Sequence, residues 1–225
     1  MTALTPDQVG LFLNAVRGDR LEALYVAAVT TGMRQGELLA LRWSDVDLEG
    51  RAVRVRATLV ETKSAFEFPE PKTARSRRQI SLTLVAATAL RRHRAAQIEE
   101  RLRAGAAWTD HDLVFASGVR EPLDGSNILR RSFYPLLAGA NLPHVRFHDL
   151  RHSAATLMLS RGVPLKIVSE ILGHSQISIT ADTYMHVTPG MQREAAAALD
   201  NVFGNCDLAV SPAAGTARPL IGHSG

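Results

Sequence analysis

Hydrophobic residues recur with a helical period along most of the chain, and the residues that interrupt this pattern mark the ends of separate helices. The segment LTPDQVGLFLNAV has Thr5 as the expected N-cap, Pro6 at the first helical position and Gln8 closing a capping box. The mostly apolar segment RLEALYVAAVTTG stops at Gly32, the usual residue for a left-handed C-terminal cap. The pattern predicts a fold built mainly from packed α-helices.

The helical period changes once, after the segment DVDLEG. The next segment, AVRVRATLV, alternates apolar and polar residues as a half-buried strand does. A polar stretch, ETKSAFEFPEPKTARSRR, separates it from RQISL, which predicts a second strand. Together they indicate a small antiparallel sheet with a basic turn. The fold class we expect is therefore mainly α with a small antiparallel β-sheet, an α+β arrangement.

Further helices are expected over 83–103 and over 125–140, the latter with Asp124 or Ser126 near its start. The short segment LVF between them is either a buried strand or a core segment. From residue 147 to residue 202 the pattern is again helical, with glycines at 162 and 173 between helices. The last 22 residues are rich in Gly, Pro, Ala and Ser and have no sustained period. We expect a domain over 1–203 and a flexible tail over 204–225.

The composition limits the classes of protein to consider. Lys and Arg outnumber Asp and Glu by 26 to 22 and the sequence pI is about 9.7, which is compatible with a nucleic-acid partner or with a merely solvated basic face. Cys206 is the only cysteine, so no disulfide can form within the chain, which suits a reducing cytoplasm. We expect no transmembrane helix and no secretory signal in MTALTPDQVG.

An arginine stands at the predicted start of the helix in TGMRQGELLALRW. The positive charge of Arg34 is unfavourable at this end of the helix dipole, which prefers anions. The placement is understandable if the arginine and the free backbone N–H groups bind one anion together. Glu37 lies one turn further on and can orient Arg34 through an ion pair. Alternatively, Arg34 is simply exposed to solvent, and its pair with Glu37 is an ordinary surface ion pair.

Cations gather in EPKTARSRRQISL, where Lys72, Arg75, Arg77 and Arg78 fall within seven residues. Such a run is either a solvated hairpin end or a surface against a phosphate backbone. Arg130 and Arg131, on another predicted helix, likewise either lie on a solvated face or contact the DNA backbone.

The segment HDLRHSAATLML has two histidines four residues apart, as in a zinc-protease helix. His148 and Arg151 share a face, beside an apolar stripe that anchors the helix in the core. Zinc would need a glutamate base where Asp149 stands and would have Arg151 beside the metal ion, so we favour a phosphate at this helix. His152 shares that direction less well, and we interpret it as a structural residue that could hydrogen-bond to a neighbouring turn.

The segment LGHSQISITADTYMHV places His174 just after a predicted helix end at Gly173. Tyr184 follows at helical spacing from Ile177 and Ala181, on or beside a buried face. A tyrosine there is commonly a core residue with a satisfied hydroxyl, but nearby histidines favour a functional phenol.

These segments, in this order, resemble the tyrosine recombinase (phage integrase) family over roughly residues 1–200. The resemblance rests on TGMRQGELLALRWSDVD, PKTARSRRQISL and HDLRHSAATLMLSRGVPLKIVSEILGHSQISITADTYMHV. It implies that Arg34 and Arg151 are catalytic arginines, that Lys72 is the hairpin lysine and that Tyr184 is the nucleophile. His148 and His174 match the two histidine positions and Glu37 matches the acidic supporting position.

The resemblance implies site-specific recombination of double-stranded DNA without a metal or other cofactor. The tyrosine would attack a phosphodiester to give a 3′-phosphotyrosyl link. The arginines and His174 would stabilise the charge, Lys72 would protonate the leaving 5′-oxygen, and His148 would accept or orient the tyrosine proton. The resemblance also implies that the chain assembles as a homo-tetramer on DNA and that accessory DNA-bending proteins are further partners. The implied location is the cytoplasm, in association with the nucleoid.

One departure from the family is the expected lack of an N-terminal core-binding domain before the catalytic domain, which would impair independent recombination. Two alternatives therefore stay open. The chain could be a truncated DNA-binding module that occupies sites or joins tetramers of a full-length relative without turnover. It could also relax DNA in the manner of a topoisomerase.

Overall fold

The structure is a computed structural model that describes residues 3–62, 66–69, 77–105, 108, 111–117 and 122–184. The helices are α1 (Pro6–Ala15), α2 (Glu22–Thr31), α3 (Gln35–Leu39), α4 (Leu84–Ala104), α5 (Gly125–Ile128), α6 (Tyr134–Gly139), α7 (Phe147–Ser160), α8 (Leu165–Leu172) and α9 (Ile177–Tyr184). A 3₁₀ turn spans Trp43–Asp45, and a π-helical turn, Leu129–Phe133, joins α5 to α6. The strands are β1 (Val46–Asp47), β2 (Ala52–Val55), β3 (Val60–Glu61), β4 (Phe66–Glu67) and β5 (Arg78–Ser81).

The capping residues predicted from the sequence are in place. The Thr5 hydroxyl accepts a hydrogen bond from the N–H of Gln8, whose side chain accepts one from the N–H of Thr5. Gly32 ends α2 at φ 63°, and the Asp124 carboxylate accepts hydrogen bonds from the first N–H groups of α5. These groups would otherwise lack partners at the helix ends, and this explains why local sequence sets the boundaries.

The strand predicted over AVRVRATLV is shorter than expected. β2 pairs antiparallel with β1 and β5 in the order β1-β2-β5, with Val53 opposite Ile80. The chain then leaves this sheet, and the N–H of Leu59 donates to the Gly36 carbonyl at the start of α3. β3 pairs with β4 in a separate two-stranded ladder. A tertiary contact thus divides the alternating segment in two, although the mainly α fold with small antiparallel sheets is confirmed.

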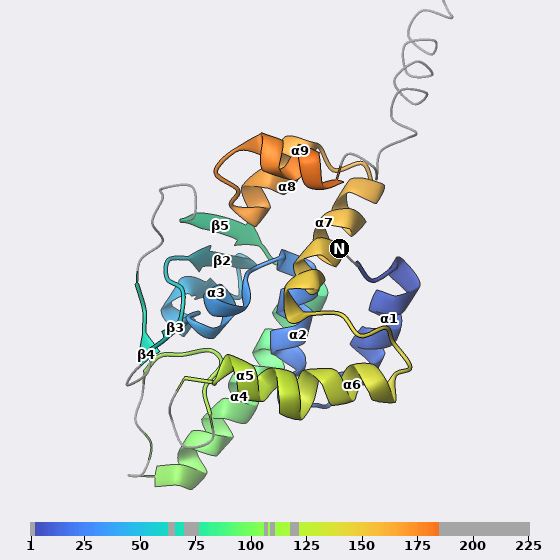
Figure 1. The fold of residues 1–225 in the computed structure, drawn as a ribbon. Coiled ribbons are helices and arrows are strands. Elements are labelled where there is room, and N and C mark those ends of the chain that lie inside the picture. The colour runs from blue at the N-terminus through green and yellow to red at the C-terminus, as the bar shows by residue number, and fades with distance from the viewer. Residues whose placement is uncertain are drawn as a thin grey trace, which may run out of the picture. The chain divides into compact units, whose positions relative to one another are not determined.

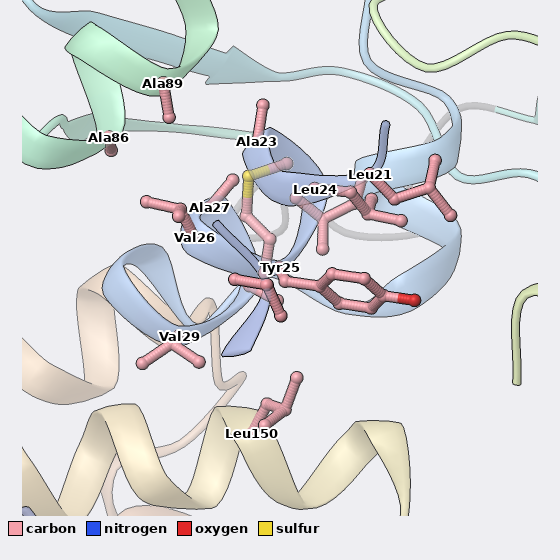
Figure 2. Close-up of a cluster of buried hydrophobic side chains, with 14 of the residues drawn as sticks. Leu21, Ala23, Leu24, Tyr25, Val26, Ala27, Val29, Ala86, Ala89 and Leu150 are labelled. Carbon is pink, nitrogen blue, oxygen red and sulfur yellow. The ribbon is translucent and has the colours of Figure 1, made fainter. Parts of the chain in front are cut away.

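The largest hydrophobic core is built around α2, whose side chains are buried on nearly all sides. Figure 2 shows α2 between α4, which contributes Ala86 and Ala89, and α7, which contributes Leu150. The rings of Tyr25 and Phe133 stack with centroids 5.9 Å apart. This packing fixes the end of α2 against the second turn of α7.

A second, smaller cluster joins α7, α8 and α9 (Figure 1). It consists of Ala155, Leu159, Val168, Leu172 and the ring of Tyr184. The cluster holds the end of α9 against α7, and β5 lies beside α8.

None of the described helices is long and apolar enough to cross a membrane. The predicted helix over 189–202 and the predicted boundary at residue 203 lie outside the described residues.

Candidate active site

A cavity of about 590 Å³ opens between the start of α3, the first turns of α7 and the turn before α9. Its lining includes five of the six residues predicted to be catalytic, namely Arg34, His148, Arg151, His174 and Tyr184. Residues 150 positions apart in the sequence therefore meet at one place. Lys72, the sixth, lies outside the described residues. The catalytic roles of these residues stay predictions.

Arg151 is the most enclosed cation of the cavity. Its Nη1 donates to the Gly32 carbonyl at 2.7 Å, and its Nη2 donates to the Leu172 carbonyl at 2.6 Å. Two of the five N–H donors of a guanidinium are thus used by the ends of α2 and α8, and three are left for a ligand. Gly32 has to be glycine, because a Cβ there would lie 2.7 Å from the Leu172 side chain and the φ of 63° strains other residues.

The charges around the cavity are mostly positive. Burial, reinforced by Arg34, lowers the pKa of the Arg151 guanidinium to about 9, although it stays charged at neutral pH. Burial and the charge of Arg151 lower the pKa of His174 to about 4, and the same two causes lower the pKa of His148. Positive charge in the cavity therefore exceeds what nearby carboxylates neutralise. A ligand with negative charge would relieve this imbalance.

Arg34 is the N-cap of α3 and is held by Glu37. Its backbone N–H donates to Glu37 Oε2 and its Nη1 donates to Oε1, both at 2.9 Å. The Arg34 side chain remains 41 % exposed, so its guanidinium is free on the cavity side while Glu37 fixes the other. The ion pair predicted between the two residues is confirmed. Because Glu37 occupies the backbone N–H, the guanidinium is the group that can bind an anion here.

Arg78, one of the residues predicted to contact DNA, is engaged with Glu37 inside the protein. Its side chain is only 7 % exposed, its Nη1 and Nη2 donate to the two Glu37 oxygens, and its Nε donates to the Ile171 carbonyl. Burial opposes ionisation of Glu37, but hydrogen bonds and charge from Arg78 and then Arg34 outweigh it and lower the Glu37 pKa. Arg78 thus links β5, α3 and α8 inside the protein, and its contact with DNA stays a prediction that the variants described below test.

His174 follows α8 directly, after Gly173 in the left-handed conformation at φ 66°. Its Nδ1 lies 2.7 Å from Thr180 Oγ1 in α9, a hydrogen bond that fixes the ring and leaves Nε2 for a ligand. A Cβ on Gly173 would lie 2.8 Å from the Arg78 guanidinium. The glycine thus permits both the turn and the passage of Arg78 beneath it.

His152 forms a hydrogen bond to a neighbouring element, as the sequence interpretation allowed, but it does so inside the cavity. It was expected to share the direction of His148 and Arg151 less well, but its Nδ1 lies 2.6 Å from the Tyr184 hydroxyl and it lines the same cavity. The predicted tyrosine partner, His148, touches the His152 ring instead, with centroids 5.0 Å apart. Burial raises the pKa of Tyr184 to about 12. Because α9 crosses α7 one turn beyond His148, the next histidine reaches the phenol.

Among the described residues, no group of three or more His, Cys, Asp or Glu side chains could hold a metal ion. In this arrangement His152 turns Nδ1 to a tyrosine, and Asp149 accepts hydrogen bonds from Arg146.

Arg146 is a cavity residue that the sequence interpretation missed. It caps α7, and Asp149 accepts from its backbone N–H and guanidinium just as Glu37 does for Arg34. A detectable signal existed, since both helices begin with an arginine followed three residues later by a carboxylate. The Asp149 hydrogen bonds raise the pKa of Arg146 above its ordinary value.

The other residues predicted to bind DNA are placed as follows. Arg77 is exposed beside β5, and Arg130 and Arg131 are exposed on the π-helical turn. Arg75, like Lys72, lies outside the described residues. Their contacts with DNA stay predictions.

Comparison with known proteins gives consistent matches. The model of the phage integrase family matches residues 2–191. A tyrosine recombinase XerC-like protein of Caldanaerobacter subterraneus is 37 % identical over 88 % of this chain and 53 % of its own length. An integrase of Streptomyces ambofaciens is 35 % identical over 89 % of this chain and 53 % of its own. The chain thus spans about half the length of these curated relatives.

Solved structures match in the same region. A Tn1549 transposon integrase in complex with circular intermediate DNA aligns with a TM-score of 0.74 and 25 % identity, over 88 % of this chain and 67 % of that one. The crystal structure of XerA recombinase aligns with a TM-score of 0.65 and 27 % identity, over 88 % of this chain and 65 % of that one.

Proposed function

The chain belongs to the phage integrase family, and from this premise we propose that it catalyses site-specific DNA recombination. The reaction would cleave and rejoin DNA strands through a 3′-phosphotyrosyl intermediate, without a metal ion. The observation that carries the proposal is the cavity in which three arginines, three histidines and Tyr184 meet. It offers positive charge and a nucleophile to one phosphodiester.

The arginines suit the transition state of phosphoryl transfer. Negative charge spreads over the non-bridging oxygens as the tyrosine oxygen attacks phosphorus, and a guanidinium can bind two oxygens at once. Arg151 has three N–H donors left for this purpose, and His174 can add one more from Nε2. Each donor is held by backbone or side-chain bonds before substrate arrives, so little reorganisation is needed during the reaction.

The leaving 5′-oxygen requires a proton, and Lys72 is the proposed general acid. This role rests on the position of Lys72 in PKTARSRRQISL and on the family match. The bond between tyrosine and phosphorus retains the energy of the broken phosphodiester, so a 5′-hydroxyl from another strand can reverse the step.

The wild-type chain tests this function with a duplex that carries a nick near the cleavage site, which lets the released 5′-fragment diffuse away. We expect an adduct between protein and DNA that survives denaturing electrophoresis, and we expect EDTA to leave its yield unchanged. Salt-sensitive DNA binding without an adduct at any protein concentration would instead indicate a binding module without turnover. Loss of the adduct in EDTA, restored by zinc, would contradict the metal-free reaction.

The proposed partner is double-stranded DNA, with Arg75, Arg77, Arg130 and Arg131 as additional backbone contacts. Arg77 and Arg78 are neighbours with opposite expected behaviour, so they form a matched pair. We predict that Arg77→Gln weakens DNA binding and reduces the salt dependence by about one released ion. Arg78→Gln should leave that slope unchanged while lowering single-turnover cleavage by on the order of tenfold to 10²-fold, because Glu37 and Arg34 shift. Equal losses of salt dependence in both variants would show that Arg78 also binds DNA.

The proposed assembly is a homo-tetramer on DNA, with accessory DNA-bending proteins as further partners and the nucleoid in the cytoplasm as the location. The proposed catalytic domain covers 1–203, with 204–225 as a flexible tail.

We predict that deleting residues 188–225 leaves the melting temperature of the remainder almost unchanged but reduces the mass of the complex on DNA. Light scattering measures that mass, and an unchanged mass would count against assembly through this segment.

A further inference from the structure

His152 and Tyr184 form a hydrogen-bonded pair in the wall of the cavity. The His152 side chain is buried, with the residue 8 % exposed, and Tyr184 is 3 % exposed. The distance of 2.6 Å between Nδ1 and the phenol oxygen is that of a strong hydrogen bond. No other partner of the Tyr184 hydroxyl is found in the described part of the chain. The role proposed above for the cavity leaves this histidine without a task.

The hydrophobic cluster of α7, α8 and α9 fixes the tyrosine ring in this place. Leu172, Val168 and Ala155 pack around the ring, so the phenol oxygen cannot swing away from His152 without breaking that packing. Both residues nevertheless line the cavity that Arg34 and Arg151 share. The pair is therefore rigid on its protein side and open toward the substrate.

The hydrogen-bonding needs of the Tyr184 phenol indicate which nitrogen of His152 carries the hydrogen. Nε2 is buried and has no hydrogen-bond partner in the described part of the chain. A neutral imidazole has one N–H and one lone pair. The phenol of Tyr184 is protonated at neutral pH and needs an acceptor when buried. The arrangement that gives the phenol its acceptor has the lone pair on Nδ1 and the hydrogen on Nε2.

We propose that His152 is a further catalytic residue, whose Nδ1 accepts the proton of Tyr184 as the phenol oxygen attacks phosphorus. This inference rests on the proposed function. In the step, the phenol O–H bond breaks and an Nδ1–H bond forms, while the new O–P bond forms and the P–O5′ bond breaks. The electron pair of the broken bond leaves on the 5′-oxygen, which takes a proton from Lys72. His152 becomes an imidazolium, and it returns its proton to the phenol oxygen when the strand is rejoined.

The groups that face His152 suit this task. His148, Arg151 and Arg146 disfavour a charged imidazole, Asp149 favours one, and His174 lies across the cavity. Burial and then His148 lower the pKa of His152, so the ring is neutral and able to accept at pH 7. A phosphodiester in the cavity would bring negative charge close to these cations. The imidazolium would then form more easily in the complex than in the free protein.

Asparagine at position 152 separates a proton acceptor from a residue that only orients the phenol. The amide of Asn can hydrogen-bond from about the position of Nδ1 but cannot take a proton. We expect His152→Asn to slow single-turnover adduct formation at pH 7 by roughly 10²–10³-fold. Without a protein base, hydroxide from solution would have to remove the phenol proton, so the rate of the variant should rise with pH below the phenol pKa. The ratio of the wild-type rate to the variant rate should therefore fall by about tenfold per pH unit between pH 7 and pH 9.

His148→Asn is the matched control, since His148 lies one turn away on the same helix and lines the same cavity. The rate of adduct formation of His148→Asn should depend on pH in the same way as that of the wild type, so the ratio of the two rates should stay constant over this pH range. The proposal would be overturned if His152→Asn kept the wild-type rate, if its deficit stayed constant with pH, or if His148→Asn alone showed the shrinking deficit. Melting temperatures and DNA affinities of both variants show whether they are folded. Failure of the wild type to form an adduct would refute the proposed function instead, so the two failures are distinguishable.

Discussion

Replacing Tyr184 with phenylalanine is expected to abolish the covalent protein–DNA adduct while leaving DNA binding intact. The Tyr184 ring packs in the cluster of Leu159, Val168 and Leu172, and phenylalanine preserves that packing. Only the hydroxyl and its hydrogen bond to His152 are lost. The nucleophile has no substitute of the same kind in the cavity, so adduct formation should fall by on the order of 10⁴-fold or more. Denaturing electrophoresis of the nicked-duplex reaction measures the adduct, with EDTA present throughout.

The matching controls for Tyr184→Phe are a gel shift and a thermal melt. The affinity for the duplex should stay within about a factor of three, because binding depends mainly on phosphate contacts elsewhere on the surface. Phenylalanine leaves the buried Nδ1 of His152 without its partner, which costs about 1–3 kcal/mol, so the variant should melt at a lower temperature but stay folded at the assay temperature. An adduct that persists at wild-type yield in this variant would remove Tyr184 from the mechanism.

Replacing Arg151 with lysine is expected to reduce the rate of adduct formation by about 10²–10³-fold. Lysine keeps one positive charge but has no planar fork, so it cannot bind the Gly32 and Leu172 carbonyls and two phosphate oxygens together. The substrate concentration at half-maximal rate should change much less than the rate, because the lost contact matters most in the transition state. Single-turnover kinetics over a range of duplex concentrations separates the two quantities.

Arg161→Lys provides the control for that variant. Arg161 is exposed at the opposite end of α7 from the cavity, where the same substitution removes no buried contact. Its rate should match that of the wild type. If Arg151→Lys melted at the wild-type temperature and cleaved at the wild-type rate, neither the two carbonyl contacts nor the planar fork of the guanidinium would be needed.

Local signals in the sequence determined much of the fold. Thr5, Gly32 and Asp124 end or begin helices through groups within a few residues of themselves, so their effects could be predicted. The strands around RQISL follow the alternation of burial in the same way. The division of AVRVRATLV into β2 and β3 could not be predicted, because the Gly36 carbonyl that binds Leu59 comes from a distant helix.

The candidate site shows the same division between local and distant information. Arg34 with Glu37, and Arg151 with His148, are recognisable because each pair lies within one helical turn. The partner of Arg78 is 41 residues away and that of His152 is 32 residues away. Nothing in the sequence around either residue reveals the contact. The basic run 72–78 therefore gave no sign that Arg78 is buried against Glu37. The position of His152 next to Arg151 likewise gave no sign that it binds the Tyr184 hydroxyl.

The most direct test of the account is to identify the amino acid and the DNA end that are joined in the adduct. The wild-type chain is trapped on the nicked duplex, digested with a protease and a nuclease, and analysed by mass spectrometry. The account predicts a single modified peptide, with a 3′-phosphate of the DNA esterified to the oxygen of Tyr184. Attachment to any other residue, or through a 5′-phosphate, would contradict it.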